Sequence, residues 1–228
     1  MIRSGHFGVE PFVNQRFIPI VGVPVLHHFK IGNGDASGIS QDVRNDVNPF
    51  FEKYFIAGWM KRFSEIVCEM YSSKIKKPMT TIVVRPGNIY GPFEKFDWET
   101  SHVLPAMIRR VVERHDPIRV WGDGQDIKDF IFVEDFVQGL ILAMEKIESF
   151  DVVNIASGHQ YKLSDLLDLI IRLDGFQGAK VEYDPTKPTM IPKRLINPAK
   201  AKRLLGFEAS TAIEVGLKKT IDWYRSTL

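Results

Sequence analysis

Apolar and polar residues follow regular periods along the chain from residue 51 onward. Residues 51–74 carry apolar side chains at helical spacing, which predicts a long helix. Residues 80–84 form a near-continuous β-branched run, typical of a parallel strand buried on both faces. We expect further helices at 103–114, 135–147, 163–173 and 198–205, and strands at 118–121, 129–133, 152–156 and 180–183. Alternating elements of this length predict an α/β layer structure.

Turn and capping residues predict where the last two helices end and begin. Gly206 is expected to end the helix before it, and the run from Thr211 to Glu214 fits a capping box that opens a last helix, ending near Tyr224. Residues 1–50 hold short apolar pieces broken by Gly and Pro, so they predict only one or two short strands and turns.

Composition narrows the class of protein. The 228 residues are 44% hydrophobic, enough for the core of one domain or a domain and a half. A net charge of +2 gives no basic excess of the kind that nucleic-acid binding needs. A single cysteine, Cys68, excludes an intrachain disulfide and a cysteine-based metal cluster, and favours a reducing compartment.

No stretch of the sequence resembles a membrane span or a signal peptide. A span needs about 18 consecutive apolar residues, and the run at 17–26 is interrupted by Pro19 and Pro24. We therefore expect a cytoplasmic protein without a membrane partner.

The segment RPGNIYGP, residues 85–92, directly follows the predicted buried strand. In open α/β sheets, ligands bind beyond the carboxyl ends of the strands. A polar loop with Asn88 and Tyr90 at that place is expected to line a pocket. The alternative is a Gly/Pro turn that only joins two elements.

Three blocks in fixed order carry a family resemblance: residues 85–92, 96–110 and 120–136. They resemble the extended short-chain dehydrogenase/reductase enzymes of the NAD(P)-dependent epimerase/dehydratase family, and within it the GDP-L-fucose synthases most of all. The resemblance covers roughly residues 51–228. It implies a partial Rossmann-like parallel sheet with a smaller α/β substrate-binding domain.

The resemblance also implies a division of the chain. Residues 51–88 would be the remainder of a dinucleotide-binding domain, and residues 89–228 mainly a substrate-binding region. Within the latter, residues 129–158 would partly return to the Rossmann sheet. Residues 1–50 would be an atypical N-terminal segment.

Two residues of the second block receive roles from the resemblance. His102 matches the acid/base of epimerisation, and an imidazole that titrates near neutrality suits proton exchange at carbons beside a ketone. Arg110 matches a pyrophosphate-binding arginine, and a guanidinium suits two-point contact with phosphate. Without the resemblance, His102 would be a capping or surface residue and Arg110 a solvated cation like Arg109.

Other binding roles follow from the same resemblance. Asn88 would hydrogen-bond the substrate or hold the nucleotide, Trp121 would pack near the sugar or base, and Lys187 would reach the nucleotide. Lys128 stands where the family has an arginine. The positive charge is therefore kept, but the planar guanidinium group with its paired N–H donors is lost. Pro86, with Asn88, would lie on the cofactor side.

The family's redox centre, a Tyr-x-x-x-Lys pair on the long helix, is matched only in part. Lys61 fits the lysine, but Ala57 stands four residues earlier in place of the tyrosine. Tyr54 begins a run that resembles the family's tyrosine and the three residues after it. A local shift could make Tyr54 the proton donor, although Gly58 would then replace the lysine.

The family's phosphate loop, Gly-x-x-Gly-x-x-Gly, has no counterpart in this sequence, because Gly32, Gly34 and Gly38 have the wrong spacing. The chain is therefore expected to be the C-terminal part of a longer enzyme or to have a replaced N-terminus. NADP or NAD is implied as cofactor only by the resemblance. A homodimer is expected, with the helix at 51–74 as the interface.

Three functions remain open on the sequence. The first is an NAD(P)-dependent nucleotide-sugar epimerase/reductase that acts on a 4-keto-6-deoxy sugar nucleotide, with a GDP-sugar as the favoured substrate. The second is a non-catalytic module that binds nucleotide sugars, favoured by Ala57 and by the missing phosphate loop. The third is a related epimerase or dehydratase for UDP- or dTDP-sugars.

Overall fold

The computed structural model describes residues 39–40, 55–187 and 191–228. Tyr54 and almost all of the N-terminal segment 1–50 lie outside the described residues. The predicted α/β class is confirmed, since helices and parallel strand pairs alternate along the chain.

Six helices are described. They are α1 (Phe55–Ser73), α2 (Val103–Val112), α3 (Val133–Lys146), α4 (Leu163–Asp174), α5 (Ala199–Leu205) and α6 (Ile213–Ser226). Each of them overlaps a helix predicted from the sequence.

The strands form four small sheets among the described residues. Three are parallel pairs: β2 (Ile82–Pro86) with β7 (Asp151–Ile155), β3 (Asn88–Tyr90) with β6 (Phe130–Phe132), and β4 (Ile118–Trp121) with β9 (Val181–Asp184). The fourth has the order β1 (Ile39–Ser40), β10 (Lys193–Ile196), β5 (Ile127–Lys128) and β8 (Tyr161–Lys162), with only β8 antiparallel.

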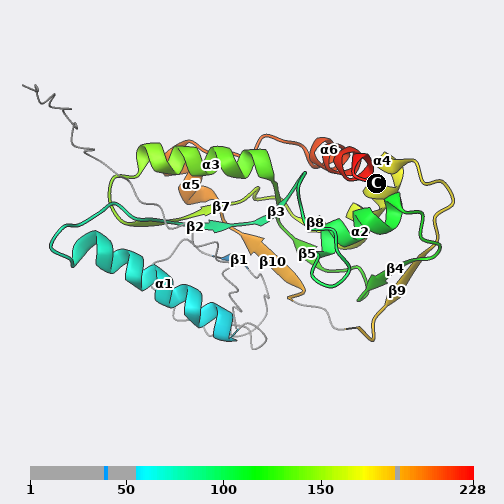
Figure 1. The fold of residues 1–228 in the computed structure, drawn as a ribbon, viewed down its shortest axis with the longest axis horizontal. Helices are drawn as coiled ribbons and strands as arrows, with labels where there is room; N and C mark the ends of the chain where they lie inside the picture. The colour runs from blue at the N-terminus through cyan, green and yellow to red at the C-terminus, as the bar shows by residue number, and fades with distance from the viewer. Residues whose placement is uncertain (1–38, 41–54, 188–190) are drawn as a thin grey trace, which may run out of the picture.

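Strand β2 is buried on both faces, as predicted. Alternate side chains point to opposite sides of a strand, so Ile82 and Val84 join a core with α3 and α5, whereas Val83 packs with Cys68 of α1. Figure 1 shows α1 and α3 on opposite sides of β2 and β7. This is a three-layer arrangement of helix, sheet and helix.

A second core lies at the other end of the molecule, where α2, α4 and α6 gather near β3, β4 and β8 (Figure 1). Its fully buried side chains include Ile108 of α2, Leu167 of α4 and Leu217 of α6. This core supports the loops that carry most of the candidate site. The predicted boundary between residues 88 and 89 stays a prediction.

Two local predictions are wrong. Residues 88–90 are not a loop but the strand β3, because they pair with β6, some forty residues later in the chain. The capping box at Thr211 does not form: Ala212 is the N-cap of α6, and no side chain caps the helix. Instead the Asp135 carboxylate accepts hydrogen bonds from the Ser210 hydroxyl at 3.2 Å and the Thr211 amide at 3.0 Å.

The outer face of α1 is apolar and exposed. Among its large side chains, Ile56, Met60 and Phe63 are between 64% and 74% exposed. No helix in the described part of the chain is long and apolar enough to cross a membrane.

Candidate functional site

Asn88 links two strands at the centre of the molecule. Its Nδ2 donates to the Asp129 carbonyl oxygen at 2.6 Å, and its Oδ1 accepts from Nη1 of Arg194 at 2.9 Å. Arg194 stands on β10 in register with Lys128 of β5. The predicted residue Asn88 therefore lies beside an arginine that sequence reasoning missed. The signal was present, since Lys193 and Arg194 are cations in an otherwise apolar strand.

The Asp129 carboxylate organises the loop that follows β7. It accepts hydrogen bonds from the Ser157 hydroxyl at 2.9 Å, the Ser157 amide at 3.1 Å and the Gly158 amide at 2.8 Å. Burial raises the pKa of Asp129 above the usual carboxyl range, and these three donors oppose the rise. The carboxylate thus holds two strand ends together near Asn88.

Lys128 is buried, and its ammonium already has partners inside the protein. Nζ lies 2.9 Å from the Asp126 carboxylate and also donates to the Ile191 carbonyl oxygen. Burial lowers the pKa of Lys128, and Asp126 partly restores it. Its predicted contact with substrate stays a prediction.

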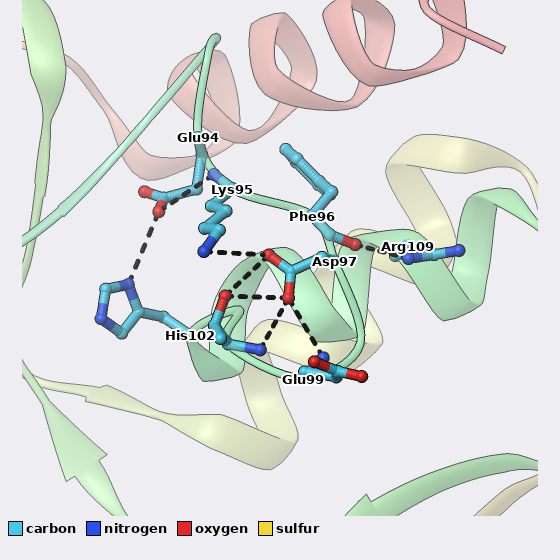
Figure 2. A network of polar contacts seen from close by, with 8 residues as sticks. Glu94, Lys95, Phe96, Asp97, Glu99, His102 and Arg109 are labelled. Carbon is cyan, nitrogen blue, oxygen red and sulfur yellow. Dashed lines mark hydrogen bonds and ion pairs between the residues drawn. The ribbon is translucent and has the colours of Figure 1, made fainter.

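His102 is the N-cap residue of α2, and its side chain is 83% exposed. Its Nδ1 lies 3.5 Å from Oε1 of Glu94, toward which the imidazole points in Figure 2. This contact raises the pKa of His102, while the charge of Arg194 opposes the rise. A raised pKa keeps more of the imidazole protonated near neutrality, which suits proton donation.

The loop before His102 is held by Asp97. Its carboxylate accepts from the Thr100 amide at 2.7 Å, the Thr100 hydroxyl at 2.8 Å and the Glu99 amide at 3.1 Å (Figure 2). These bonds lower the pKa of Asp97. They give the exposed loop a defined turn, from which α2 starts at Val103.

A cavity of about 480 Å³ brings Arg110 and Trp121 together. Arg110 comes from α2, and Trp121 ends β4, where it is 60% exposed. The rest of the lining consists of Trp98, His115, Asp116, Pro117 and Arg119. The volume falls within the range of small-molecule sites.

Arg110 and Arg109 have different surroundings. Arg109 donates to Glu113 at 2.8 Å and to the Phe96 carbonyl oxygen at 2.6 Å, and its guanidinium carbon lies 4.0 Å from the centre of the Trp98 ring. Arg110 lies 4.9 Å from the same ring and donates to a carbonyl oxygen of its own helix. Burial and the neighbouring Arg109 lower the pKa of Arg110. Arg110 is therefore the one of the two that lines the cavity.

The remaining predicted residues are spread over the structure. Lys61 lies on α1, Pro86 ends β2, and Lys187 is exposed in the turn after β9. The lining of the cavity includes none of these three, and it includes neither His102 nor Asn88. Ala57 stands in α1, in the position expected for a tyrosine.

No group of metal-binding side chains occurs among the described residues. Cys68 is buried and reduced, and burial together with the nearby Glu65 raises the pKa of its thiol. The described site therefore offers cations, indoles, imidazoles and carboxylates as its chemical groups.

Comparison with known proteins agrees with this chemistry. Residues 47–156 match the model of the NAD dependent epimerase/dehydratase family. GDP-L-fucose synthase 1 of Arabidopsis thaliana is 33% identical over 161 residues, which are 69% of this chain and 49% of the relative. A dTDP-4-dehydro-6-deoxy-D-allose reductase of a Streptomyces species is 27% identical over 165 residues, 72% of this chain and 49% of the relative.

Solved structures of epimerases that act on nucleotide sugars are similar to this chain. The UDP-glucose 4-epimerase of Thermotoga maritima, solved with UDP-glucose, has a TM-score of 0.67 at 28% identity and covers 75% of this chain and 53% of its own. A UDP-glucuronic acid 4-epimerase from Bacillus cereus has a TM-score of 0.74 at 21% identity, covering 94% and 62%, and shows the fold alone.

The chain spans about half the length of the curated relatives that it matches. The matched region contains β2, β7, Asn88 and Asp129, and the parallel α/β fold is the one shared with the solved epimerases. This chain belongs to the NAD dependent epimerase/dehydratase family, among the extended short-chain dehydrogenases/reductases.

Proposed function

We propose that this chain supplies the substrate-handling part of an NAD(P)-dependent nucleotide-sugar epimerase/reductase. The observation that carries the proposal is the cavity in which Arg110 and Trp121 meet. A guanidinium binds a diphosphate through paired charge-assisted hydrogen bonds, and an indole stacks on a base or sugar. The favoured substrate is a GDP-linked 4-keto-6-deoxy sugar, a choice supported by the similarity to GDP-L-fucose synthase 1.

His102 is the proposed acid/base of the epimerisation. A ketone acidifies the neighbouring C–H bonds, so a base can remove a proton from one face while a protonated imidazole returns one to the other. Its exposure leaves the ring accessible to a ligand, and Glu94 favours its protonated form. Replacing His102 by Gln should abolish the exchange of these C–H protons with solvent deuterium. Unchanged exchange would refute the role.

NAD or NADP is the proposed cofactor, and it would supply the hydride when bound. The described residues fit only part of such a group. Lys61 stands on α1 and Pro86 ends β2, and these are two of the positions for which the family resemblance implies cofactor contacts. The Asn88 side chain is already bonded to Asp129 and Arg194, and the sequence contains no Gly-x-x-Gly-x-x-Gly. We assign no step of hydride transfer to these residues.

Calorimetric titration with GDP tests the proposed binding. Arg110→Ala should weaken GDP binding by at least about tenfold, because a charged hydrogen bond contributes about 1.5–3 kcal/mol. Arg203→Ala is the matched control, since Arg203 is exposed on α5, away from the cavity. Equal GDP affinity in the wild type and in Arg110→Ala would refute the proposal.

Turnover tests the reaction itself. The expected result is oxidation of NADPH in the presence of GDP-4-keto-6-deoxymannose. A second candidate, a non-catalytic module that binds nucleotide sugars, is favoured by Ala57 at the tyrosine position. It predicts GDP-sugar binding without any binding of NAD or NADP in the same calorimeter.

UDP- and dTDP-sugars are the alternative substrates of the proposed enzyme, because the names of the relatives and of the solved structures include both kinds of sugar nucleotide.

The proposed homodimer uses the exposed apolar face of α1. Ile56, Met60 and Phe63 lie on this face, and a surface of this kind is typical of an interaction site. Light scattering coupled to size-exclusion chromatography should give twice the mass of the chain, and Phe63→Glu should halve it. A monomeric wild type would refute the dimer.

A cytoplasmic location is also proposed for this protein. Cell fractionation tests it.

A further inference from the structure

Asp116 is the one carboxylate among the lining residues of the cavity. It stands in the turn between α2 and β4, exposed, beside His115 and Pro117. The other charged groups of the lining are the guanidinium groups of Arg110 and Arg119. The cavity thus has two cations suited to phosphate and one anion that is not.

A diphosphate and the Asp116 carboxylate repel each other, so a bound nucleotide must present a different part to Asp116. That part needs hydrogen-bond donors, because an ionised carboxylate only accepts. In a nucleoside diphosphate the donors are the ribose hydroxyls and the N–H groups of the base, and only the base differs from one nucleotide to another. Trp121, with its 60% exposed indole, provides a surface on which a base can stack within the same cavity.

The bases differ in what they offer to a carboxylate. Guanine has two adjacent donors, the ring N1–H and the exocyclic amine, which match the two oxygens of a carboxylate. Uracil and thymine have one N–H between two carbonyl oxygens, and both of these oxygens repel a carboxylate. Adenine and cytosine place an acceptor next to their amine. Guanine is therefore the base that a single carboxylate selects.

We propose that Asp116 reads the guanine base of a GDP-linked substrate, accepting hydrogen bonds from N1–H and the 2-amino group while the base stacks on Trp121. Arg110 then holds the diphosphate. This inference rests on the proposed function, because it requires that the cavity lined by Arg110 and Trp121 holds the nucleotide. It adds the residue that separates GDP-sugars from UDP- and dTDP-sugars.

Calorimetry with four nucleoside diphosphates on the full chain tests this assignment. The wild type should bind GDP most tightly, IDP more weakly because hypoxanthine lacks the 2-amino group, and UDP most weakly. Asp116→Asn should weaken GDP binding by about tenfold or more and should not weaken UDP binding, because uracil, like xanthine, presents an N–H beside a carbonyl oxygen. It should strengthen binding of XDP, because an asparagine amide donates to the 2-carbonyl of xanthine and accepts from its N1–H.

Asp222→Asn is the matched control, because it makes the same chemical change on the exposed surface of α6. A GDP-to-UDP affinity ratio that is the same in the wild type and in Asp116→Asn would overturn the role of Asp116 and leave the nucleotide site intact. An equal loss of all four ligands would overturn it as well. A wild type that binds none of them would refute the proposed function and, with it, this inference.

Discussion

Glu65 and Arg85 form a buried ion pair with two hydrogen bonds that joins α1 to the end of β2. Arg85 Nε donates to Oε1 at 2.9 Å and Nη2 donates to Oε2 at 2.8 Å. Their side chains are only 6% and 3% exposed. Because Arg85 opens the segment RPGNIYGP, this pair fixes the position of α1, with Lys61, relative to the strand that leads to Asn88.

Removing one partner of this pair should be strongly destabilising. Arg85→Ala leaves the Glu65 carboxylate buried without its main counter-ion, and we expect a loss of about 3–5 kcal/mol in the free energy of unfolding. Urea unfolding followed by circular dichroism measures the loss. The control is Lys202→Ala, whose exposed pair with Glu208 should contribute less than about 1 kcal/mol. Similar losses in both variants would contradict the importance of the buried pair.

The contact between Glu94 and His102 should be visible in a pH titration. Glu94→Gln removes the acceptor that favours the imidazolium, so the pKa of His102 should fall toward its ordinary value. A raised folded-state pKa means that the contact stabilises the fold at pH below the unfolded pKa, and that this stabilisation is lost as pH rises through the folded pKa. NMR titration of the histidine ring protons reports the shift.

The control for this titration is Glu99→Gln. Glu99 is an exposed acid in the same loop, and the contacts of His102 are with Glu94. An equal shift from both substitutions would show that general charge in the loop, and not the specific contact, sets the pKa of His102.

Cys68 should report the opening of α1. Its thiol is buried against Val83 and Val152, and burial and Glu65 raise its pKa, so little reactive thiolate is present at neutral pH. We expect slow modification by a thiol reagent in the folded protein and fast modification in urea. Because it is the only cysteine in the sequence, mass spectrometry gives the rate without ambiguity. Fast labelling without denaturant would contradict the packing of α1 on β2.

Gly216 should tolerate no larger side chain, although it lies inside helix α6. A Cβ at this position would lie 2.9 Å from both the Phe132 and Tyr90 rings. Alanine normally stabilises a helix by roughly 0.5–1 kcal/mol relative to glycine, but overpacking costs typically about 1–3 kcal/mol. We expect Gly216→Ala to lower the melting temperature. Val215→Ala, one position along on the exposed face, should change stability by less than about 0.5 kcal/mol.

The long periodic elements were predictable from local pattern. Helical spacing indicated α1, α2, α3 and α4, and the β-branched run indicated β2. In α2, α3, α4 and β2 the apolar side chains enter a core, whereas most apolar side chains of α1 are exposed. The short strands β3, β5, β8 and β10 were not predicted. Two to four residues carry too little pattern, and their hydrogen bonds come from partners far away in the chain.

The candidate site, like the fold, was predictable in part from the sequence and in part only from the tertiary structure. Residue type and the order of three sequence blocks by themselves determined the family and named Arg110 and Trp121 as binding residues. Only the tertiary structure decided that these two line one cavity with Asp116, and that Asn88 is bonded to Arg194. The reason is physical: a side chain's chemistry is local, whereas its neighbours are set by the pairing of β5 with β10 and of β4 with β9, which no spacing along the chain reveals.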